Sequence, residues 1–381
     1  MPWTVEVVRV AVVTESFLPS VNGVTTSVLR VLDHLATRGH QAVVVCPGPA
    51  PSSYAGFQVR ECAGVDFQGF RAAVPNRRLV KAVIDLAPDV LHAAAPFGIG
   101  AQALTLAKRQ GIPSVAVFQT DVAGYTRRYG LSLTAPAAWR WLRRVHNTAD
   151  LTLAPSSDTL ADLAAAGVER TRWWGRGVDA RTYHPNRRNL AEVRALRARL
   201  APQGQVLVGY VGRLAPEKQV ERLAAAARTP GVRLVLVGDG PSRPLVERAL
   251  AGTDALLLGR LDGAELANAY AAMDVFVHAG TQETFGQTLQ EAAAAGLPVV
   301  APASGGPKDI VKHGHTGFLV RPDDDRAIAD AVARLAADPG LRARMGEAGR
   351  RDVLPRSWTA LGDALLGHYE DVIHARALQP A

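Results

Sequence analysis

Short runs of apolar residues alternate with helical patterns along almost the whole chain of 381 residues. Each run is rich in valine, leucine and alanine, which is typical of strands buried on both faces of a parallel sheet. The expected strands cover residues 7–13, 41–46, 90–93, 113–118, 151–154, 206–211, 233–237, 255–258, 275–278, 298–301 and 317–320. This repeated order of strand and helix predicts an α/β fold with parallel sheets that carry helices on both faces.

The strand–helix order is interrupted at residues 170–189, where glycine, proline and turn residues gather. A chain of this length is too long for one ordinary core and fits two domains of about 150–200 residues each. We place the domains at residues 1–184 and 185–356, with a closing segment at residues 357–381. Because the halves share no repeated sequence, two successive doubly wound domains are favoured over a single large sheet.

Two carboxylates bracket the start of a helix in the second half. Glu283 precedes a helical sequence pattern and Glu291 lies within it. Phe285, Gly286 and Gln287 form the N-terminus of this helix. Unpaired N–H groups and the helix dipole favour an anion at such an end, and a diphosphate would fit. The two carboxylates could then accept hydrogen bonds from hydroxyls on either side of it. For the bare spacing, the alternative is a surface helix with two solvated glutamates.

Two cations follow the first strand of the second half. Arg213 lies just past that strand and Lys218 comes five residues later. A guanidinium fork and an ammonium charge suit a leaving diphosphate, on which negative charge builds as its bond to a sugar breaks. The alternative is a solvated basic turn.

Several motifs together resemble retaining glycosyltransferases of family 4, which have the two-domain GT-B fold. The motifs are ETFGQTLQEA followed by GLPVVAPASGGPKDIV, GRLAPEK, and GVDARTYHP with tyrosine where the family has phenylalanine. Within the family, the chain looks most like the GDP-mannose-dependent α-mannosyltransferases of actinobacteria. The resemblance covers nearly the whole chain and implies that the closing helix, from Trp358, returns to pack on the first domain.

The resemblance also implies donor-binding roles for individual residues. In the family, the first glutamate meets the transferred sugar, the second meets the ribose, and Arg213 and Lys218 hold the diphosphate. The loop glycine Gly23, the glycine Gly238 and the pair Gly305–Gly306 are expected near the donor, although plain turns are the alternative. The implied donor-binding residues are Gly23, Arg213, Lys218, Gly238, Arg260, Leu261, Glu283, Phe285, Gly286, Gln287 and Glu291. The absence of a G-x-G-x-x-G fingerprint argues against a dinucleotide-dependent dehydrogenase.

Acceptor-binding residues are expected at the carboxyl edge of the first sheet, where open α/β sheets bind ligands. We assign this role to Asn22, Asp121 and Tyr125, and Asp121 is also a candidate catalytic residue. Family members carry a histidine around this point, whereas this chain has Gln119 and Asp121, which puts a general-base role in doubt. Helix N-capping is the alternative for Asp121.

The net charge is +8, and the excess lies in the first half: residues 1–184 carry 19 basic and 13 acidic side chains. Arg77, Arg78 and Lys81 precede the apolar face of a helical pattern, which suits anionic lipid headgroups. A second candidate of this kind is AAWRWLRRVH at residues 137–146. The alternatives are a solvated amphipathic helix for the first and buried tryptophans for the second. A nucleic-acid partner would explain the charge but not the anion-binding motifs.

The composition indicates in which cellular compartment the protein is expected and whether it needs a metal or cofactor. Cys46 and Cys62 have no metal or redox spacing, so free core thiols and a reducing compartment are expected. No apolar window is long enough to span a bilayer, so the protein is expected to be cytoplasmic, or peripheral on the inner face of the membrane. The run Asp323–Asp325 resembles a metal-binding pair, but it precedes a helix, where N-capping explains it. We expect no metal and no cofactor besides the nucleotide sugar.

These patterns lead to one hypothesis and its rivals. The chain is expected to move mannose from GDP-mannose to a hydroxyl acceptor, such as a glycolipid or phosphoinositol lipid, with retention. The departing phosphate oxygen is expected to take the proton of the acceptor in a front-face attack. A retaining transferase that uses UDP-glucose or another nucleotide sugar on a soluble acceptor is the first alternative. A sugar-nucleotide epimerase of the same architecture is the second.

Overall fold

A computed structural model of the protein describes residues 7–20, 22–67, 70–73, 83, 85–119 and 135–378. The chain forms two compact units. The first unit comprises residues 1–176 together with residues 358–381, and the second unit comprises residues 177–357. The units therefore divide between Arg176 and Gly177, a few residues before the position that we placed at 185, and the last helix belongs to the first unit.

The first unit contains an eight-stranded sheet with the order β10-β9-β8-β7-β1-β2-β4-β3, in which only β3 runs antiparallel to its neighbour. Its strands are β1 (Arg9–Thr14), β2 (Gln41–Pro47), β3 (Ser53–Tyr54), β4 (Phe57–Cys62), β7 (Val90–Ala94), β8 (Ser114–Val117), β9 (Leu151–Ala154) and β10 (Thr171–Trp173). A separate hairpin joins β5 (Gly64–Phe67) and β6 (Phe70–Ala73). The five predicted strands are confirmed, while β3, β4, β10 and the hairpin are additional.

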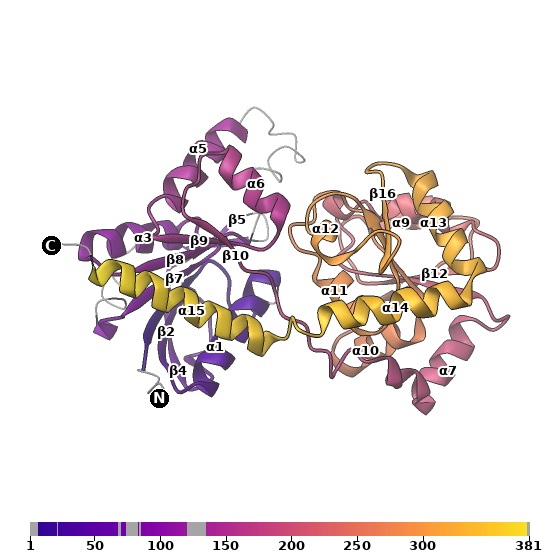
Figure 1. Ribbon diagram of the computed structural model, residues 1–381, viewed down its shortest axis with the longest axis horizontal. Helices are drawn as coiled ribbons and strands as arrows, with labels where there is room; N and C mark the ends of the chain where they lie inside the picture. The colour runs from indigo at the N-terminus through magenta and orange to yellow at the C-terminus, as the bar shows by residue number, and fades with distance from the viewer. Residues whose placement is uncertain are drawn as a thin grey trace. The chain divides into compact units, whose positions relative to one another are not determined.

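Helices cover both faces of this sheet. They are α1 (Gly23–Thr37), α3 (Ile99–Gln110), α5 (Ala135–His146), α6 (Ser157–Ala165) and α15 (Trp358–Ala377). Figure 1 shows the closing helix α15 lying along the sheet of this unit beside α1. The indole N–H of Trp174 donates to the Leu361 carbonyl at 2.9 Å, and the Tyr369 hydroxyl lies 2.7 Å from Nδ1 of the buried His92. These two contacts and an apolar helix face fix α15 to the unit.

The second unit contains a six-stranded parallel sheet with the order β13-β12-β11-β14-β15-β16. Its strands are β11 (Val206–Val211), β12 (Val232–Val237), β13 (Leu256–Gly259), β14 (Val275–Val277), β15 (Val299–Pro302) and β16 (Gly317–Val320), and all six were predicted. Chain order reverses between β11 and β14, so the sheet has its topological switch point there. In open α/β sheets, ligands bind beyond the carboxyl ends of the strands at this point.

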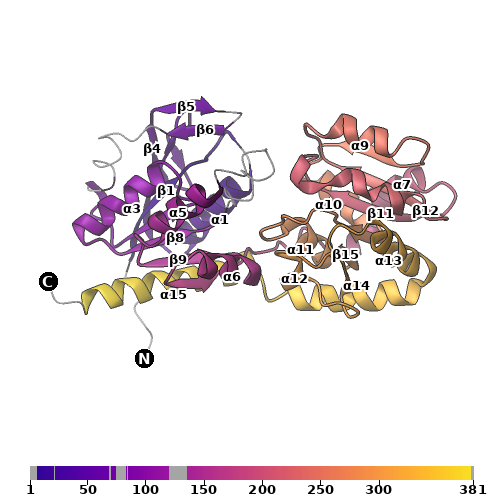
Figure 2. The same cartoon turned by 90° about the horizontal axis from the view of Figure 1, so that it is seen from above.

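The second unit, seen from above in Figure 2, also carries helices on both faces of its sheet. Residues of α10 and α11 pack on one face, and residues of α8 and α13 pack on the other. Its α-helices are α7 (Ala191–Leu200), α8 (Ala224–Ala227), α9 (Arg243–Ala249), α10 (Gly263–Ala272), α11 (Gln287–Ala294), α12 (Pro307–Ile310), α13 (Asp325–Ala337) and α14 (Pro339–Val353). Short 3₁₀ turns are η2 (Pro185–Asn189), η3 (Pro216–Lys218) and η4 (Val220–Leu223). The fold class is thus two doubly wound α/β units, as predicted.

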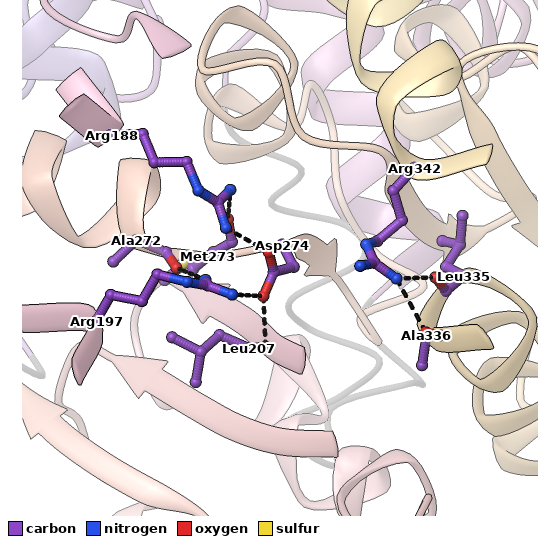
Figure 3. Close-up of polar contacts among 9 residues, drawn as sticks. All are labelled: Arg188, Arg197, Leu207, Ala272, Met273, Asp274, Leu335, Ala336 and Arg342. Carbon is purple, nitrogen blue, oxygen red and sulfur yellow. Dashed lines mark hydrogen bonds and ion pairs between the residues drawn. The ribbon is translucent and has the colours of Figure 1, made fainter. Parts of the chain in front are cut away.

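A buried carboxylate aligns the two strands at the switch point from their amino ends (Figure 3). Asp274 precedes β14, accepts hydrogen bonds from Arg188 at 2.5 Å and Arg197 at 2.8 Å, and also accepts from the Leu207 N–H of β11 at 2.9 Å. Burial opposes its ionisation, but the two guanidinium groups and these hydrogen bonds hold the pKa of Asp274 below its usual range. Since β14 is fixed to β11 at this end, the loops at the opposite ends are held in register.

Two predictions about side chains are confirmed within the described residues. Cys46 and Cys62 are buried thiols outside any disulfide, and burial raises the pKa of Cys46 to about 12. The Asp324 carboxylate caps α13 by accepting from the Ala327 N–H at 2.9 Å. Its neighbours Asp323 and Asp325 both pair with Arg222. The aspartate run is therefore a helix cap and an ion-pair anchor.

Candidate active site

The loops that follow β11 and β14 carry the candidate site. The loop after β11 contains Arg213 and Lys218, and the loop after β14 contains His278 and Glu283 before α11 begins. These strands are adjacent and parallel, with Val208 of β11 paired with Val275 of β14. The carboxyl ends of both strands therefore meet at the switch point, which explains why residues about 65 positions apart in the sequence lie side by side.

The centre of the site is an ion pair between the two loops. The Lys218 Nζ lies 2.5 Å from Glu283 Oε2, and their side chains are only 22% and 15% exposed. The other oxygen, Oε1, accepts a hydrogen bond from the Gly286 N–H at 3.2 Å. Glu283 is therefore not a solvated surface carboxylate. The pair brings a cation and an acid into one polar, water-poor position in front of α11.

Glu291 is held by a second network, on the face of α11 toward α10. Its Oε2 accepts from the Tyr270 hydroxyl at 2.9 Å, and its Oε1 accepts from the Gln287 amide at 3.2 Å. Glu291 keeps part of its surface exposed. Burial nevertheless raises the pKa of its carboxyl to about 7, against the two hydrogen bonds, which favour the charged form. A further hydrogen-bond donor beside Glu291 would therefore stabilise the charged form of its carboxyl.

The N-terminus of α11 is set by glycine and by a buried aromatic ring. Gly286 precedes the helix with φ of +95°, a conformation that side chains rarely adopt, and Phe285 is 3% exposed. The Phe285 ring thus anchors the turn while the backbone of Gly286 and Gln287 starts the helix. Phe285 does not have a surface-exposed ring with which to contact a ligand, so only its backbone is available for that role.

The glycine pair Gly305–Gly306 serves packing of the backbone. A Cβ on Gly305 would lie 2.3 Å from the Glu283 carbonyl oxygen, and one on Gly306 would lie 2.1 Å from the Phe285 carbonyl oxygen. The Gly306 N–H donates to the Glu283 carbonyl at 2.7 Å. The loop after β15 therefore lies directly against the Glu283–Phe285 backbone and holds it in place.

Gly238 has a similar role under the loop after β11. Its φ is +136°, and a Cβ there would lie 1.9 Å from the Gly212 carbonyl oxygen. Arg213 is exposed, and its carbonyl accepts from the Tyr210 hydroxyl at 3.1 Å. Within the described part of the chain, its guanidinium pairs with no acidic side chain. The structure thus joins Lys218, but not Arg213, directly to Glu283.

Arg260 and Leu261 follow β13. The Arg260 side chain is 66% exposed and forms an ion pair with Asp262 at 3.1 Å, while Leu261 is partly buried against the apolar cluster beneath α11. Both residues lie at the carboxyl edge of the sheet, where sequence analysis expected them. The arginine side chain already has a partner in Asp262.

In the first unit, Asn22 caps α1. Its Oδ1 accepts from the N–H groups of Val24 and Thr25 at 3.0 Å, and its Nδ2 donates to Ser16 Oγ at 2.7 Å. Gly23 leaves room for Arg176, since a Cβ would lie 2.9 Å from Nη1 of that arginine. Arg176 in turn donates to Gln119 at 3.2 Å. The Asn22 amide is committed to the fold, while Gly23 lies beside a cation.

Five of the predicted residues lie outside the described part of the chain. They are the acceptor candidates Asp121 and Tyr125 and the basic residues Arg77, Arg78 and Lys81. The second basic candidate is described: α5 carries exposed Arg140, Arg143 and Arg144, which line a cavity of about 260 Å³ with Asn147. Its tryptophans are partly buried, and Trp141 packs on Phe97 with ring centroids 4.8 Å apart. Packing therefore accounts for the tryptophans but not for the arginines.

Sequence reasoning missed two buried polar residues at the switch points. His278 directly follows β14, is 1% exposed and lies against Glu283, with Nε2 3.8 Å from Oε2. Glu15 follows β1, and its Oε1 accepts from the N–H groups of Phe97, Gly98 and Gly100 at the start of α3. The available signal was the same in both cases: a polar residue directly after an apolar strand at the ligand-binding edge of the sheet.

Among the described residues, no three histidine, cysteine or acidic side chains gather in a way that could hold a metal ion. Within the same part of the chain, none of the helices combines the length and the hydropathy needed to cross a membrane.

Comparisons with known proteins cover both units. The family model "Glycosyltransferase Family 4" matches residues 21–182, and "Glycosyl transferases group 1" matches residues 194–352. A protein of Mycobacterium tuberculosis named GDP-mannose-dependent alpha-mannosyltransferase is 46% identical over 98% of this chain and 99% of its own length. A Corynebacterium glutamicum protein of the same name is 41% identical over 96% of this chain and 89% of its own length.

Solved structures agree on the fold. Sucrose-phosphate synthase of Thermosynechococcus elongatus superposes with a TM-score of 0.78 at 22% identity, over 96% of this chain and 99% of that one. The Anabaena protein HepE, in complex with UDP and glucose, superposes with a TM-score of 0.74 at 21% identity, over 95% and 99%. At this level of identity the likeness concerns the fold alone.

Proposed function

Because this chain belongs to glycosyltransferase family 4, we propose that it transfers mannose from GDP-mannose to a hydroxyl acceptor and forms an α-mannoside. It is a hexosyltransferase with the GT-B fold. The similar proteins of M. tuberculosis and C. glutamicum, aligned over nearly the whole chain, support the donor. The single observation that carries the proposal is the Lys218–Glu283 pair at the β11/β14 switch point.

The donor is proposed to lie across the start of α11. Its diphosphate would be neutralised by Lys218 and Arg213 and would accept from the N–H groups of Gly286 and Gln287. Glu291 would accept from the ribose hydroxyls, and the backbone of Arg260 and Leu261 would contact the base. The raised pKa of Glu291 supports this role, because hydroxyl donors compensate a poorly solvated carboxylate.

The reaction is proposed to proceed with retention. The bond between the anomeric carbon and the phosphate oxygen breaks while the acceptor oxygen bonds to the same face of the anomeric carbon. The acceptor proton passes to the departing phosphate oxygen, so the products are the α-mannoside and GDP. Lys218 and Arg213 would stabilise the charge that builds on the diphosphate, which is the role that a metal ion fills in other transferases. Glu283 would hold the mannose by its hydroxyls.

The acceptor is proposed to be a glycolipid or phosphoinositol lipid. An M. tuberculosis protein that is 30% identical over 94% of this chain is named a GDP-mannose-dependent alpha-(1-6)-phosphatidylinositol monomannoside mannosyltransferase. The three arginines of α5 offer cationic groups for an anionic bilayer surface. Co-sedimentation with liposomes tests this: binding should require anionic lipid and weaken in Arg140→Glu, and indifference to both would indicate a soluble acceptor.

A transfer assay with radiolabelled donors tests the proposed function. Label from GDP-mannose should enter a lipid extract only when acceptor is present, and Glu283→Gln should reduce turnover strongly. Incorporation from UDP-glucose alone would overturn the mannose assignment while leaving the fold. Conversion of the donor without any acceptor would favour an epimerase instead.

A further inference from the structure

The imidazole of His278 lies behind the catalytic ion pair, and the proposed reaction gives it no role. It directly follows β14, is almost fully buried, and places Nε2 3.8 Å from Glu283 Oε2. This is the same oxygen that the Lys218 ammonium approaches to 2.5 Å. Glu283 Oε2 thus has one cation in contact and one ring nitrogen about 1 Å beyond hydrogen-bond distance.

The ring is held in place by its neighbours. The Tyr210 ring stacks on it, with centroids 6.3 Å apart and 15° between the planes. Gly280 closes the other side, since a Cβ there would lie 3.2 Å from His278 Nε2 and 2.9 Å from the Glu217 carbonyl oxygen. Neither ring nitrogen makes a hydrogen bond of normal geometry within the described residues. Buried polar groups normally have partners, so this one calls for an explanation.

Burial keeps the imidazole of His278 neutral. Glu283 and Lys218 face it from the two loops and oppose one another, and burial lowers the pKa of the imidazole to about 4. The nearby Tyr210 hydroxyl faces Glu217 and Glu221, and burial raises the pKa of that phenol well above its usual range. At neutral pH the imidazole therefore carries one N–H and no charge, and it can donate a hydrogen bond without competing with Lys218 for the diphosphate.

Lys218 has to pair with two different anions, the Glu283 carboxylate and the diphosphate of the donor. In the structure its ammonium contacts Glu283, whereas the proposed reaction requires it at the donor's diphosphate. An ammonium that turns toward two phosphate charges leaves a largely buried carboxylate oxygen with weaker compensation, which is costly in a poorly solvated position. A nearby donor that becomes available only after this movement would offset the loss.

We propose that His278 is a positioning residue that donates its Nε2–H to Glu283 Oε2 when Lys218 turns to the donor diphosphate. The exchange keeps Glu283 ionised and aimed at the sugar during transfer. It requires the ring nitrogen and the carboxylate oxygen to approach one another by about 1 Å. The inference rests on the proposed function, because the diphosphate is what draws Lys218 away.

The test compares three side chains of similar size at position 278. His278→Leu removes the donor, and His278→Gln keeps an N–H donor. With GDP-mannose, the Leu variant should lose tenfold or more in kcat, while GDP affinity by calorimetry stays within about twofold. The acid limb of its kcat–pH profile should move up by about one pH unit, because Glu283 loses a hydrogen bond that favours its charged form. The Gln variant should recover most of kcat.

Each outcome either supports or overturns the positioning role of His278. Equal losses in Leu and Gln, or an unchanged kcat and pH profile in Leu, would overturn the positioning role. If the Leu variant does not fold, His278→Met carries the same comparison, with GDP affinity as the check on folding. Wild-type protein that transfers no sugar from GDP-mannose would instead refute the proposed function, before position 278 is tested.

Discussion

At the scale of single residues, the site is organised by how each carboxylate is compensated. Glu283 has a cation within 2.5 Å, whereas Glu291 has only the neutral donors Tyr270 and Gln287. Two glutamates eight positions apart are therefore compensated differently, the first by a positive charge and the second by neutral hydrogen-bond donors. The difference suits two roles, with the first carboxylate held against a cation and the second sensitive to what binds beside it.

Glu291 gives a prediction about stability and pH. Its pKa in the folded protein, about 7, lies above its ordinary value of 4.5, so the folded state holds a proton that the unfolded state releases between these values. The contribution of Glu291 to the free energy of unfolding is present below pH 4.5 and is lost as the pH rises through 7. Relative to wild type, Glu291→Gln should be stabilised between pH 5 and pH 8 by on the order of 1–2 kcal/mol, after allowance for partial exposure. Thermal unfolding across this range measures the difference.

The matched control is Glu265→Gln, which changes an exposed glutamate on the neighbouring helix α10. The buried histidines His92, His146 and His278 have lowered pKa values and affect stability in the opposite sense, but they are common to both variants. If Glu291→Gln and Glu265→Gln show the same dependence on pH, the burial of Glu291 does not have the energetic effect inferred here.

The residues of the site could be predicted from sequence to different degrees. The glutamates and Lys218 stand in local motifs whose chemistry is readable, and the structure joins Lys218 to Glu283. His278 and Glu15 were missed because their importance comes from neighbours that are distant in sequence. Asn22 was expected at the acceptor, yet its amide caps α1, a choice that depends on where Ser16 lies.

At the scale of elements, the loops of the second unit are held by glycines that touch other backbones. Gly306 is the clearest case, because a Cβ would lie 2.1 Å from the Phe285 carbonyl oxygen and no side chain can move aside. The turn that carries Glu283 and starts α11 therefore depends on the loop after β15. Sequence analysis expected this glycine pair near the donor, and its contact with backbone could not be read from a single loop.

Gly306→Ala should displace the Glu283–Gln287 turn. We expect a loss of about 1–3 kcal/mol in the free energy of unfolding and a tenfold or greater loss in GDP affinity, because the N–H groups of α11 would move. Gly367→Ala is the control, since that glycine lies in α15 with nothing within 4 Å of a Cβ, and there alanine should be neutral or stabilising. Urea unfolding and calorimetry measure both quantities. Unchanged GDP affinity in Gly306→Ala would mean that this turn does not bind the donor.

The strands differ in how well they could be predicted from the sequence. All eleven expected strands form, because buried parallel strands read as continuous apolar runs. β4 was missed because only two of its six residues, Val59 and Cys62, are buried, and β10 because it has three residues, Thr171–Trp173, with little burial. Strands of this kind near the edges of a sheet are recognised by their neighbours rather than by their own pattern.

At the scale of the whole molecule, the chain leaves the first unit at Arg176 and returns to it at Trp358. The return of the chain to the first unit could be predicted only from the resemblance to a family, because the sequence of α15 does not indicate which unit the helix packs against. The residues that hold α15, Trp174 and His92, come from distant strands. The second unit, in contrast, is one continuous segment, residues 177–357, and contains all the expected donor-binding residues except Gly23.

This division predicts the effect of ending the chain at Ser357. Loss of α15 uncovers apolar surface of the first unit and leaves the buried His92 without the Tyr369 hydroxyl, so the first unit should lose several kcal/mol of stability. GDP binding should persist, because the donor site lies in the other unit. Calorimetry with GDP and limited proteolysis measure the two effects. A truncated chain in which both units are digested at the wild-type rate would contradict the assignment of α15.

The most direct test of the account is the steady-state transfer of mannose from GDP-mannose by Lys218→Ala, beside Lys108→Ala, which removes an exposed lysine on α3. The account predicts a loss of about 100-fold or more in kcat/KM for Lys218→Ala, as expected when a cation that stabilises a leaving group is removed, and no change for Lys108→Ala. Transfer by Lys218→Ala within threefold of the wild type would contradict the claim that the loops at the β11/β14 switch point hold the donor.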